Sequence, residues 1–233
     1  MRYEGIKKGI FLERPNRFIA YVEIEGQIEV CHVKNTGRCR ELLISGAKVI
    51  VQESSHPGRK TKYDLIAVWK GERLINIDSQ APNVIFREWL SSGLYFPDLK
   101  TVKSEQKYGN SRFDYYLEAG ERKIFVEVKG VTLEQEGVAL FPDAPTLRGV
   151  KHLQELATCM EEGYEAMVIF IIQMKGIRYM APNDKMHPEF GDTLRELFHK
   201  GAQVLAIDCQ VTENEIIPDS LVQVKLNNIF LSW

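Results

Sequence analysis

The chain has 233 residues, 44% of them hydrophobic and 27% charged, and a formal net charge of −2. This composition indicates an ordinary soluble globular protein with room for one large domain or two modest ones. Since no run approaches the roughly 18 apolar residues of a membrane span and the N-terminus lacks a signal-peptide core, a membrane protein is excluded and a cytoplasmic location is expected.

The four cysteines are scattered and include no C-x-x-C pair and no cysteine and histidine spacing typical of zinc. Cys31 and Cys39 could in principle meet across a hairpin, but a reduced protein is the simpler interpretation. The charge is unevenly distributed: residues 31–62 contain seven Lys or Arg and two acids. A locally basic region in a neutral protein is a candidate phosphate-binding face.

Residues 6–80 are predicted to be strands. The segment 18–33 alternates apolar and polar residues on both sides of the turn Glu25-Gly26, and a second hairpin turns at Lys70-Gly71. Five or so short strands over about 75 residues suit a small closed barrel, of which the OB-fold is the common form. The sequence therefore predicts an OB-fold-like barrel over residues 1–80.

Basic and amide side chains gather in three loops of this predicted barrel. Such a mixture of cations with nearby aromatic residues suits phosphate contact and base stacking. Each loop alone could equally be a solvated charged face, whereas the three together favour nucleic-acid binding. The candidates are Arg14, Asn16, Arg17, Asn35, Thr36, Arg38, Arg40, Arg59, Lys60 and Lys62.

Residues 80–93 are predicted to form a helix, with Asn83 able to cap its start and Gly93 able to end it. The second domain, residues 81–233, is expected to begin here. Glu88 lies one turn from Val84 and Ile85, on the side expected to face inward, so it is a candidate additional acid of a catalytic site. An exposed surface glutamate is the alternative.

Residues 111–133 carry the strongest chemical pattern. A two-residue loop at Gly120-Glu121 would pair Ala119 with Arg122 and, by counting, Asp114 with Glu127. Asp114, Tyr116, Phe125, Glu127 and Lys129 would then share one face, opposite Phe113, Tyr115, Leu117, Ile124, Val126 and Val128.

Opposed like charges are destabilising, so two facing carboxylates with Lys129 nearby suggest a bound divalent cation. The ligands would be Asp114 and Glu127, helped by the Val128 carbonyl, and oxygen ligands favour Mg²⁺ or Mn²⁺. Lys129 would position a nucleophilic water or stabilise developing charge. The alternative is that both acids lie on a solvated strand face.

The remaining segments complete a second, mixed α/β domain. Residues 137–142 are predicted to add a third strand to the hairpin, and Thr146 is predicted to cap a helix that ends before Gly163. Arg148 and Lys151 on this helix could clamp a phosphate, unless they form a solvated basic face. Residues 166–173 and 202–208 are predicted strands joined by a helical crossover; residues 211–233 could return as a strand.

Several segments together resemble the sugar fermentation stimulation protein A family, in order and spacing over nearly the full chain: RPNRF (14–18), HVKNTGR (32–38), YGNSRFD (108–114), VEVKGVTL (126–133) and FPDAPTLRGVKHLQEL (141–156). The hairpin resembles the PD-(D/E)xK nuclease superfamily, although Arg112-Phe113-Asp114 lacks its proline. The resemblance implies an OB-fold-like barrel followed by a nuclease-like α/β core with Asp114, Glu127 and Lys129 in its site.

Two functions follow from these expectations. The first is a Mg²⁺- or Mn²⁺-dependent nuclease acting on DNA or on RNA. The second, also implied by the resemblance, is a non-catalytic DNA-binding regulator of sugar (maltose) metabolism genes. A small-molecule enzyme is disfavoured because no glycine-rich phosphate loop is present. Related nuclease folds often dimerise, so the oligomeric state is left open between monomer and homodimer.

Overall fold

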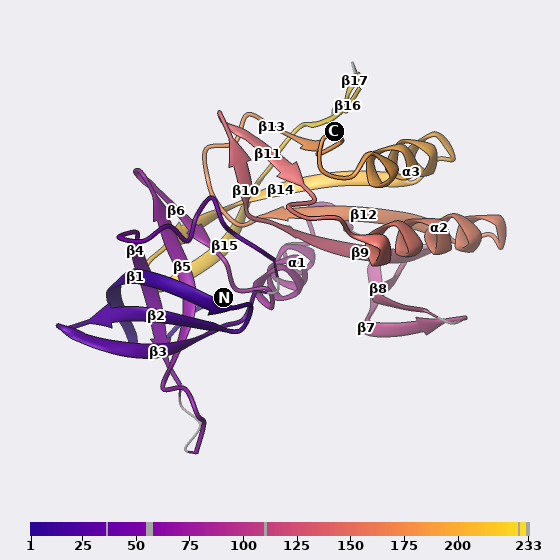
Figure 1. Cartoon of the computed structure of the whole chain (residues 1–233). Coiled ribbons are helices and arrows are strands. Elements are labelled where there is room, and N and C mark those ends of the chain that lie inside the picture. Colours follow the sequence, from indigo (N-terminus) through magenta and orange to yellow (C-terminus); the bar gives the residue numbers. More distant parts are fainter. Residues whose placement is uncertain (36, 55–57, 110, 228, 232–233) are drawn as a thin grey trace.

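The computed structural model describes residues 1–35, 37–54, 58–109, 111–227 and 229–231 and folds the N-terminal third into a barrel (Figure 1). Its strands follow the order β3-β2-β1-β4-β5-β6, and a parallel pairing of β3 with β5 closes it. They are β1 (Ile6–Asn16), β2 (Ile19–Ile24), β3 (Gln27–Val33), β4 (Lys48–Glu53), β5 (Tyr63–Lys70) and β6 (Arg73–Asn76). The predicted OB-fold-like barrel is confirmed.

The rest of the chain is built on a six-stranded mixed sheet of order β15-β14-β12-β9-β8-β7. Its elements are α1 (Ala81–Ser91), β7 (Leu99–Tyr108), β8 (Ser111–Ala119), β9 (Arg122–Val131), α2 (Leu147–Glu161), β12 (Glu165–Ile172), α3 (Pro188–His199), β14 (Gln203–Thr212) and β15 (Glu215–Leu221). The strands β9, β12 and β14 run parallel. The predicted nuclease-like α/β core is confirmed.

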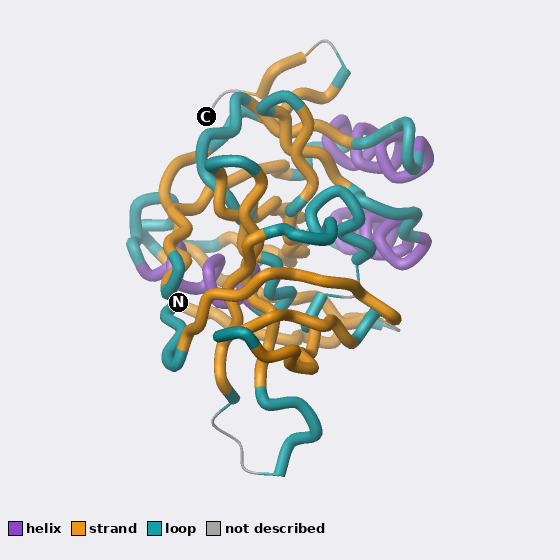
Figure 2. The backbone as a smooth tube through the Cα atoms, turned by 60° about the vertical axis from the view of Figure 1, so that its left-hand side comes forward, coloured by secondary structure: helices purple, strands orange, loops and turns teal. Residues whose placement is uncertain are grey.

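Helices cover both faces of this sheet. Alternate residues of β12 point to opposite sides: Val168 and Phe170 pack with α2 and α3, whereas Ile169 and Ile171 pack with α1. Figure 2 shows α2 and α3 side by side, with strands between them and α1. A strand buried on both faces reads as a continuous apolar run, which explains the lack of alternation in residues 166–173.

Residues 137–142 contribute a strand as predicted, but this strand does not pair with the central hairpin. These residues form β11 of a separate small sheet, because Glu136 and Gly137 both have positive φ (+50° and +79°) and fold the segment back on itself. The elements of that sheet are β10 (Leu133–Gln135), β11 (Val138–Phe141), β13 (Tyr179–Pro182), β16 (Val224–Leu226) and β17 (Ile229–Leu231). The third strand of the central hairpin is instead β7, an edge strand.

The sequence predicts the N-cap of α2 correctly and that of α1 incorrectly. Thr146 caps α2 as predicted, its Oγ1 accepting the Gly149 N–H at 3.0 Å. Asn83 does not cap α1: the N-cap is Gln80, and Asn83 lies within the first turn. Its side chain is therefore available to the sheet, where it contacts Asp114.

All four cysteines are free and buried. Among the described residues, none of the helices is long and apolar enough to cross a membrane.

The barrel is joined to the core by a buried ion cluster around Glu134, which is 5% exposed. Lys70 Nζ lies 2.7 Å from Glu134 Oε2, and Arg73 Nη1 lies 3.1 Å from Oε1. Burial opposes ionisation of Glu134, but the hydrogen bonds from Lys70 and from the Gly137 N–H, with the charges of Lys70 and Arg73, lower its pKa to about 2. The ionised carboxylate therefore stabilises the folded chain.

Replacing Glu134 with glutamine is expected to destabilise the protein in a pH-dependent way. Because the folded pKa lies below the ordinary value, the contribution is fully present above about pH 4.5 and is lost as pH falls toward 2. Because solvent screens the two partly exposed cations, we expect the substitution to lower the free energy of unfolding by about 1–2 kcal/mol at pH 7. Urea unfolding at pH 7 and pH 3 measures it. The exposed Glu136→Gln is the control, and equal losses at both pH values would contradict the assignment.

Candidate active site

The central hairpin has the predicted register. Ala119 pairs with Arg122 and Leu117 with Ile124. Gly120, the first loop residue, has φ +58°. The ladder ends at Tyr115 and Val126, one residue short of the two acids. Beyond this pair the strict alternation fails, because Phe113 packs on Phe125 with ring centroids 5.3 Å apart instead of on the opposite face.

Asp114 lies at the end of the paired region and is held by two donors. Its Oδ2 accepts the Val128 N–H at 2.8 Å, and its Oδ1 accepts the Asn83 Nδ2 at 3.2 Å. Burial, together with the charge of Glu127, raises the pKa of Asp114, despite these hydrogen bonds and the charge of Lys129. The two carboxylates therefore repel each other within one site, as the sequence predicts.

Glu127 is 3% exposed, so the alternative of a solvated strand face is wrong for this acid. Its Oε1 lies 2.5 Å from both Lys129 Nζ and His152 Nδ1. Burial opposes ionisation, but the hydrogen bond from His152 and the charge and hydrogen bond of Lys129 outweigh it and lower the pKa of Glu127. The structure thus brings Asp114, Glu127 and Lys129 together and leaves Glu127 ionised.

His152 also belongs to this site, whereas the sequence by itself favours a packed or surface histidine. It lies on α2 and is 8% exposed, and its Nε2 accepts a hydrogen bond from Arg148 Nε at 3.3 Å. A neutral imidazole that accepts at Nε2 carries its proton at Nδ1, where it donates to Glu127. The available signal was spacing: Gly149, His152 and Leu156 form one buried stripe of the helix.

Two buried oxygen atoms of the site have no hydrogen-bond partner among the described residues, Glu127 Oε2 and Asn83 Oδ1. A buried carboxylate oxygen without a donor is costly, and a cation would satisfy it. Within the described part of the chain, no three Cys, His, Asp or Glu side chains surround a common point. The residues therefore fit an ion that takes one or two carboxylates and completes its shell with other oxygens and water, as Mg²⁺ does.

Replacing Asn83 with alanine is expected to weaken divalent-cation binding about tenfold, because Asp114 loses the donor that orients it. Titration of Mn²⁺ followed by calorimetry measures the affinity. The matched control is Gln154→Ala, which removes an exposed amide from α2. Equal affinities in wild type and Asn83→Ala would show that Asn83 plays no part in the site.

The expectation that Glu88 faces this site is wrong. Glu88 lies on the exposed side of α1, and its Oε1 is 2.8 Å from the N-terminal amino group of Met1. The amino group is fixed in turn by the Ile216 carbonyl at 2.8 Å. Because the helix begins three residues earlier than an Asn83 cap would allow, it is Asn83 that α1 directs to the carboxylates.

Four of the predicted nucleic-acid-binding residues have side-chain polar atoms engaged within the chain, among them Asn35, whose Nδ2 donates to the Ile77 carbonyl and whose Oδ1 accepts the Gly37 N–H. Arg14 donates to four backbone carbonyls in residues 17–38. Asn16 Oδ1 accepts the N–H groups of residues 18 and 19 in a turn. Arg59 forms a two-bond ion pair with the buried Asp64. These contacts hold the loops in place and give the four side chains a structural role.

The other predicted residues are more accessible. Lys60 is exposed, Lys62 pairs with Glu53 at 3.5 Å, and Lys151 pairs with Glu155 at 3.7 Å. Arg148, besides its bond to the imidazole, is exposed near the start of α2. Thr36 lies outside the described residues.

A cleft of about 340 Å³ lies beside the carboxylates and is lined by both the barrel and the core. Asn35 and Gly37 come from the barrel, Asn83 and Val128 from the carboxylate site, and Asp143 from the loop before α2. A Cβ built on Gly37 would lie 2.6 Å from Asp143 Oδ2, so the two loops pack closely. The cleft therefore lies at the boundary between the barrel and the core, next to the carboxylate site.

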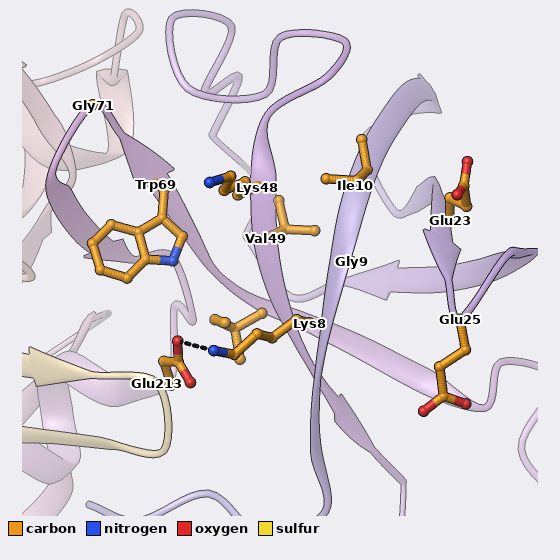
Figure 3. Close-up of a pocket in the computed structure, with 11 residues that line it drawn as sticks. Lys8, Gly9, Ile10, Glu23, Glu25, Lys48, Val49, Trp69, Gly71 and Glu213 are labelled. Atoms are coloured by element: carbon orange, nitrogen blue, oxygen red, sulfur yellow. Dashed lines mark ion pairs between the residues drawn. The ribbon is translucent and has the colours of Figure 1, made fainter.

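A second cavity, of about 620 Å³, lies on the outer face of the barrel near the β14–β15 turn (Figure 3). Lys8 Nζ pairs there with Glu213 at 2.7 Å, beside the indole of Trp69. Glu23 and Glu25 also line it, so acids outnumber lysines. Like charges would repel a phosphate, and none of the carboxylate-site residues reaches this cavity, which we therefore leave out of the site.

Comparison with known proteins gives consistent matches. A model of the sugar fermentation stimulation protein RE domain matches residues 80–215, and one of the SfsA N-terminal OB domain matches residues 12–77. The sugar fermentation stimulation protein homolog of Desulfitobacterium hafniense is 64% identical, over 97% of this chain and 99% of its own. The homolog of Ruminiclostridium cellulolyticum is 55% identical, over 97% and 100%.

A solved structure has the same fold over its whole length. Pyrococcus furiosus SfsA in complex with Ca²⁺ superimposes with a TM-score of 0.84 at 29% identity, covering 97% of this chain and 98% of that one.

Proposed function

The chain belongs to the sugar fermentation stimulation protein A family, and from this premise we propose that it is a metal-dependent nuclease. Residues 1–80 would bind the nucleic acid, expected to be DNA, and residues 81–233 would hydrolyse its phosphodiester bonds. The observation that carries the proposal is Glu127 Oε2, a buried oxygen without a partner among the described residues, next to a second carboxylate. Without a cation this pair would repel a phosphate, so a protein that only binds nucleic acid has no use for it.

The proposed cofactor is Mg²⁺ or Mn²⁺. Asp114 and Glu127 would hold it, with the Val128 carbonyl and water as further oxygen ligands. The related Pyrococcus furiosus protein was solved in complex with Ca²⁺, also a hard cation that takes oxygen ligands, which supports a divalent metal here. When bound, such an ion lowers the pKa of water and neutralises phosphoryl oxygen charge.

The side chains around it have separate proposed roles. Lys129 Nζ donates a hydrogen bond to Glu127 Oε1 at 2.5 Å. In the reaction it would position the attacking water or neutralise charge that develops on the phosphate. His152 holds the same oxygen from the other side at 2.5 Å and so fixes the orientation of Glu127. Asn83 and the Val128 N–H do the same for Asp114. A site held from several elements is rigid enough to orient a reacting group.

The test is to incubate the protein with labelled single-stranded, duplex and branched DNA and with RNA, in Mg²⁺, Mn²⁺ or EDTA. Cleavage of at least one substrate that needs the metal and is absent with Glu127→Ala would support the proposal and identify the substrate class. Binding of DNA without cleavage under every condition, unchanged in Glu127→Ala, would overturn it and favour the alternative, a DNA-binding regulator.

A further inference from the structure

Three arginines face a cavity of about 410 Å³ on the barrel, separate from the carboxylate site. Arg17, Arg38 and Arg40 line it, and each is exposed. None of the three has an acidic partner among the described residues, although Glu13 is part of the lining. Most other cations of the barrel are paired, so this concentration of unneutralised charge is local. We call the cavity the arginine pocket.

The pocket is built around the guanidinium of Arg14, which also lines it. Arg14 Nη2 donates to the carbonyls of Arg17 and Asn35, both at 2.7 Å, and Nη1 donates to those of Gly37 and Arg38, both at 2.9 Å. One side chain thus fixes the backbone beneath two of the pocket arginines. The backbone at these two arginines is therefore ordered before a ligand binds, which lowers the entropic cost of binding.

The backbone between Arg38 and Arg40 is also unusual. Cys39 has φ +45° and is 1% exposed. A non-glycine residue in this region is strained, and such strain persists only where the surrounding structure imposes it. Here the Cys39 carbonyl accepts the N–H groups of Leu42 at 3.1 Å and Leu43 at 2.9 Å. The strained turn keeps both arginines at the rim of one cavity.

We propose that the arginine pocket binds the terminal phosphate of a nucleic-acid strand, an inference that rests on the proposed function and names its substrate class. An internal phosphodiester carries one negative charge, whereas a terminal phosphomonoester carries nearly two at neutral pH and has three acceptor oxygens. Three arginines that line one cavity match the terminal group, because each guanidinium can donate two parallel hydrogen bonds. A groove for internal phosphates would instead spread its cations along the surface.

Residues next to the arginine pocket are suited to contact the nucleotide that carries this phosphate. Phe18 is 46% exposed, and the guanidinium of Arg17 lies 4.7 Å from its ring centroid. An exposed aromatic ring beside a phosphate site can stack a terminal base. Gly37 lines both the arginine pocket and the cleft beside the carboxylates. A strand anchored by its end would thereby pass Gly37 on its way to the site of cleavage.

The experiment measures binding in EDTA, so that it does not depend on cleavage. Single-stranded DNA, fluorescently labelled within the strand, is prepared with a 5′-phosphate, a 3′-phosphate or hydroxyls at both ends, and anisotropy gives its affinity. We expect the DNA with either the 5′-phosphate or the 3′-phosphate to bind about tenfold more tightly than the DNA with hydroxyls at both ends. Comparison of the two phosphorylated DNAs identifies which end the pocket binds. In Arg38→Ala/Arg40→Ala this preference is lost.

The matched control is Lys107→Ala/Lys123→Ala, which removes the same number of positive charges from exposed positions on β7 and β9. It should keep the preference for the phosphorylated end, and thermal melting checks that each variant is folded. Equal affinity for all three DNAs, or a preference that survives in the arginine double variant, would overturn the proposal. Failure of the nuclease proposal would leave this binding preference intact, so the two are distinguishable.

Discussion

Replacing Glu127 with glutamine is expected to lower metal-dependent cleavage at least about a thousandfold. The amide keeps the shape of the side chain but removes the negative charge that the cation needs. It also leaves Lys129 without its ionic partner and His152 without a charged acceptor, since both contact Oε1 at 2.5 Å. Initial rates at saturating Mg²⁺ measure the loss, and calorimetric titration with Mn²⁺ should show weaker metal binding.

Glu118→Gln is the matched control, because Glu118 lies on the same hairpin and accepts hydrogen bonds from Thr101 and Tyr116 at the surface. This variant should cleave at the wild-type rate. Thermal melting separates a catalytic loss from unfolding, since both variants are compared at a temperature where they are folded. A Glu127→Gln enzyme that keeps more than about a tenth of the activity would contradict the role of Glu127.

Replacing Lys129 with methionine is expected to lower kcat about a hundredfold or more while leaving metal binding as tight as, or tighter than, in the wild type. Methionine keeps the length of the side chain but not its charge. In the absence of metal, Lys129 neutralises Glu127, so removing it frees the carboxylate for the cation. Single-turnover cleavage and Mn²⁺ titration measure the two effects separately.

Lys123→Met provides the comparison on the same strand, since Lys123 is exposed and pairs in the ladder with Glu118, away from the site. Its kcat should be unchanged. If Lys129→Met lost metal affinity in proportion to its rate, Lys129 would be a structural residue of the site and not one that acts on the water or the phosphate.

The central hairpin shows how much of the site could be predicted from local sequence. Its register follows from a two-residue loop with glycine first, so the pairing of Ala119 with Arg122 needs no knowledge of the rest of the fold. The prediction failed at Phe113, whose ring lies with Phe125 and His152 on the α2 side although β8 is still paired there with β7. Tertiary packing sets the direction of this side chain, and local alternation does not contain that information.

The partners of the acids could not be predicted in this way. His152 is 25 residues from Glu127 in sequence, and Asn83 is 31 residues from Asp114. A histidine next to a helix's apolar stripe is compatible with many positions, and only the packing of α2 on the sheet brings its Nδ1 to Glu127. The prediction for Glu88 failed because the buried stripe of α1 runs through Ile85, Phe86 and Leu90 and leaves Glu88 on the exposed side.

By itself, then, the sequence predicted the barrel, the mixed α/β core and the hairpin that carries Asp114, Glu127 and Lys129, because alternation, turn residues and caps act between near neighbours in the chain. The tertiary structure alone decided which polar groups are available to a ligand. The sequence gives no reason to distinguish Arg14 from Arg17 and Arg38. In the fold, however, Arg14 donates hydrogen bonds to four backbone carbonyls up to 24 residues away, whereas the other two side chains are exposed to solvent. A guanidinium binds whatever acceptors the fold brings within reach, and those acceptors are set by the folding of distant segments.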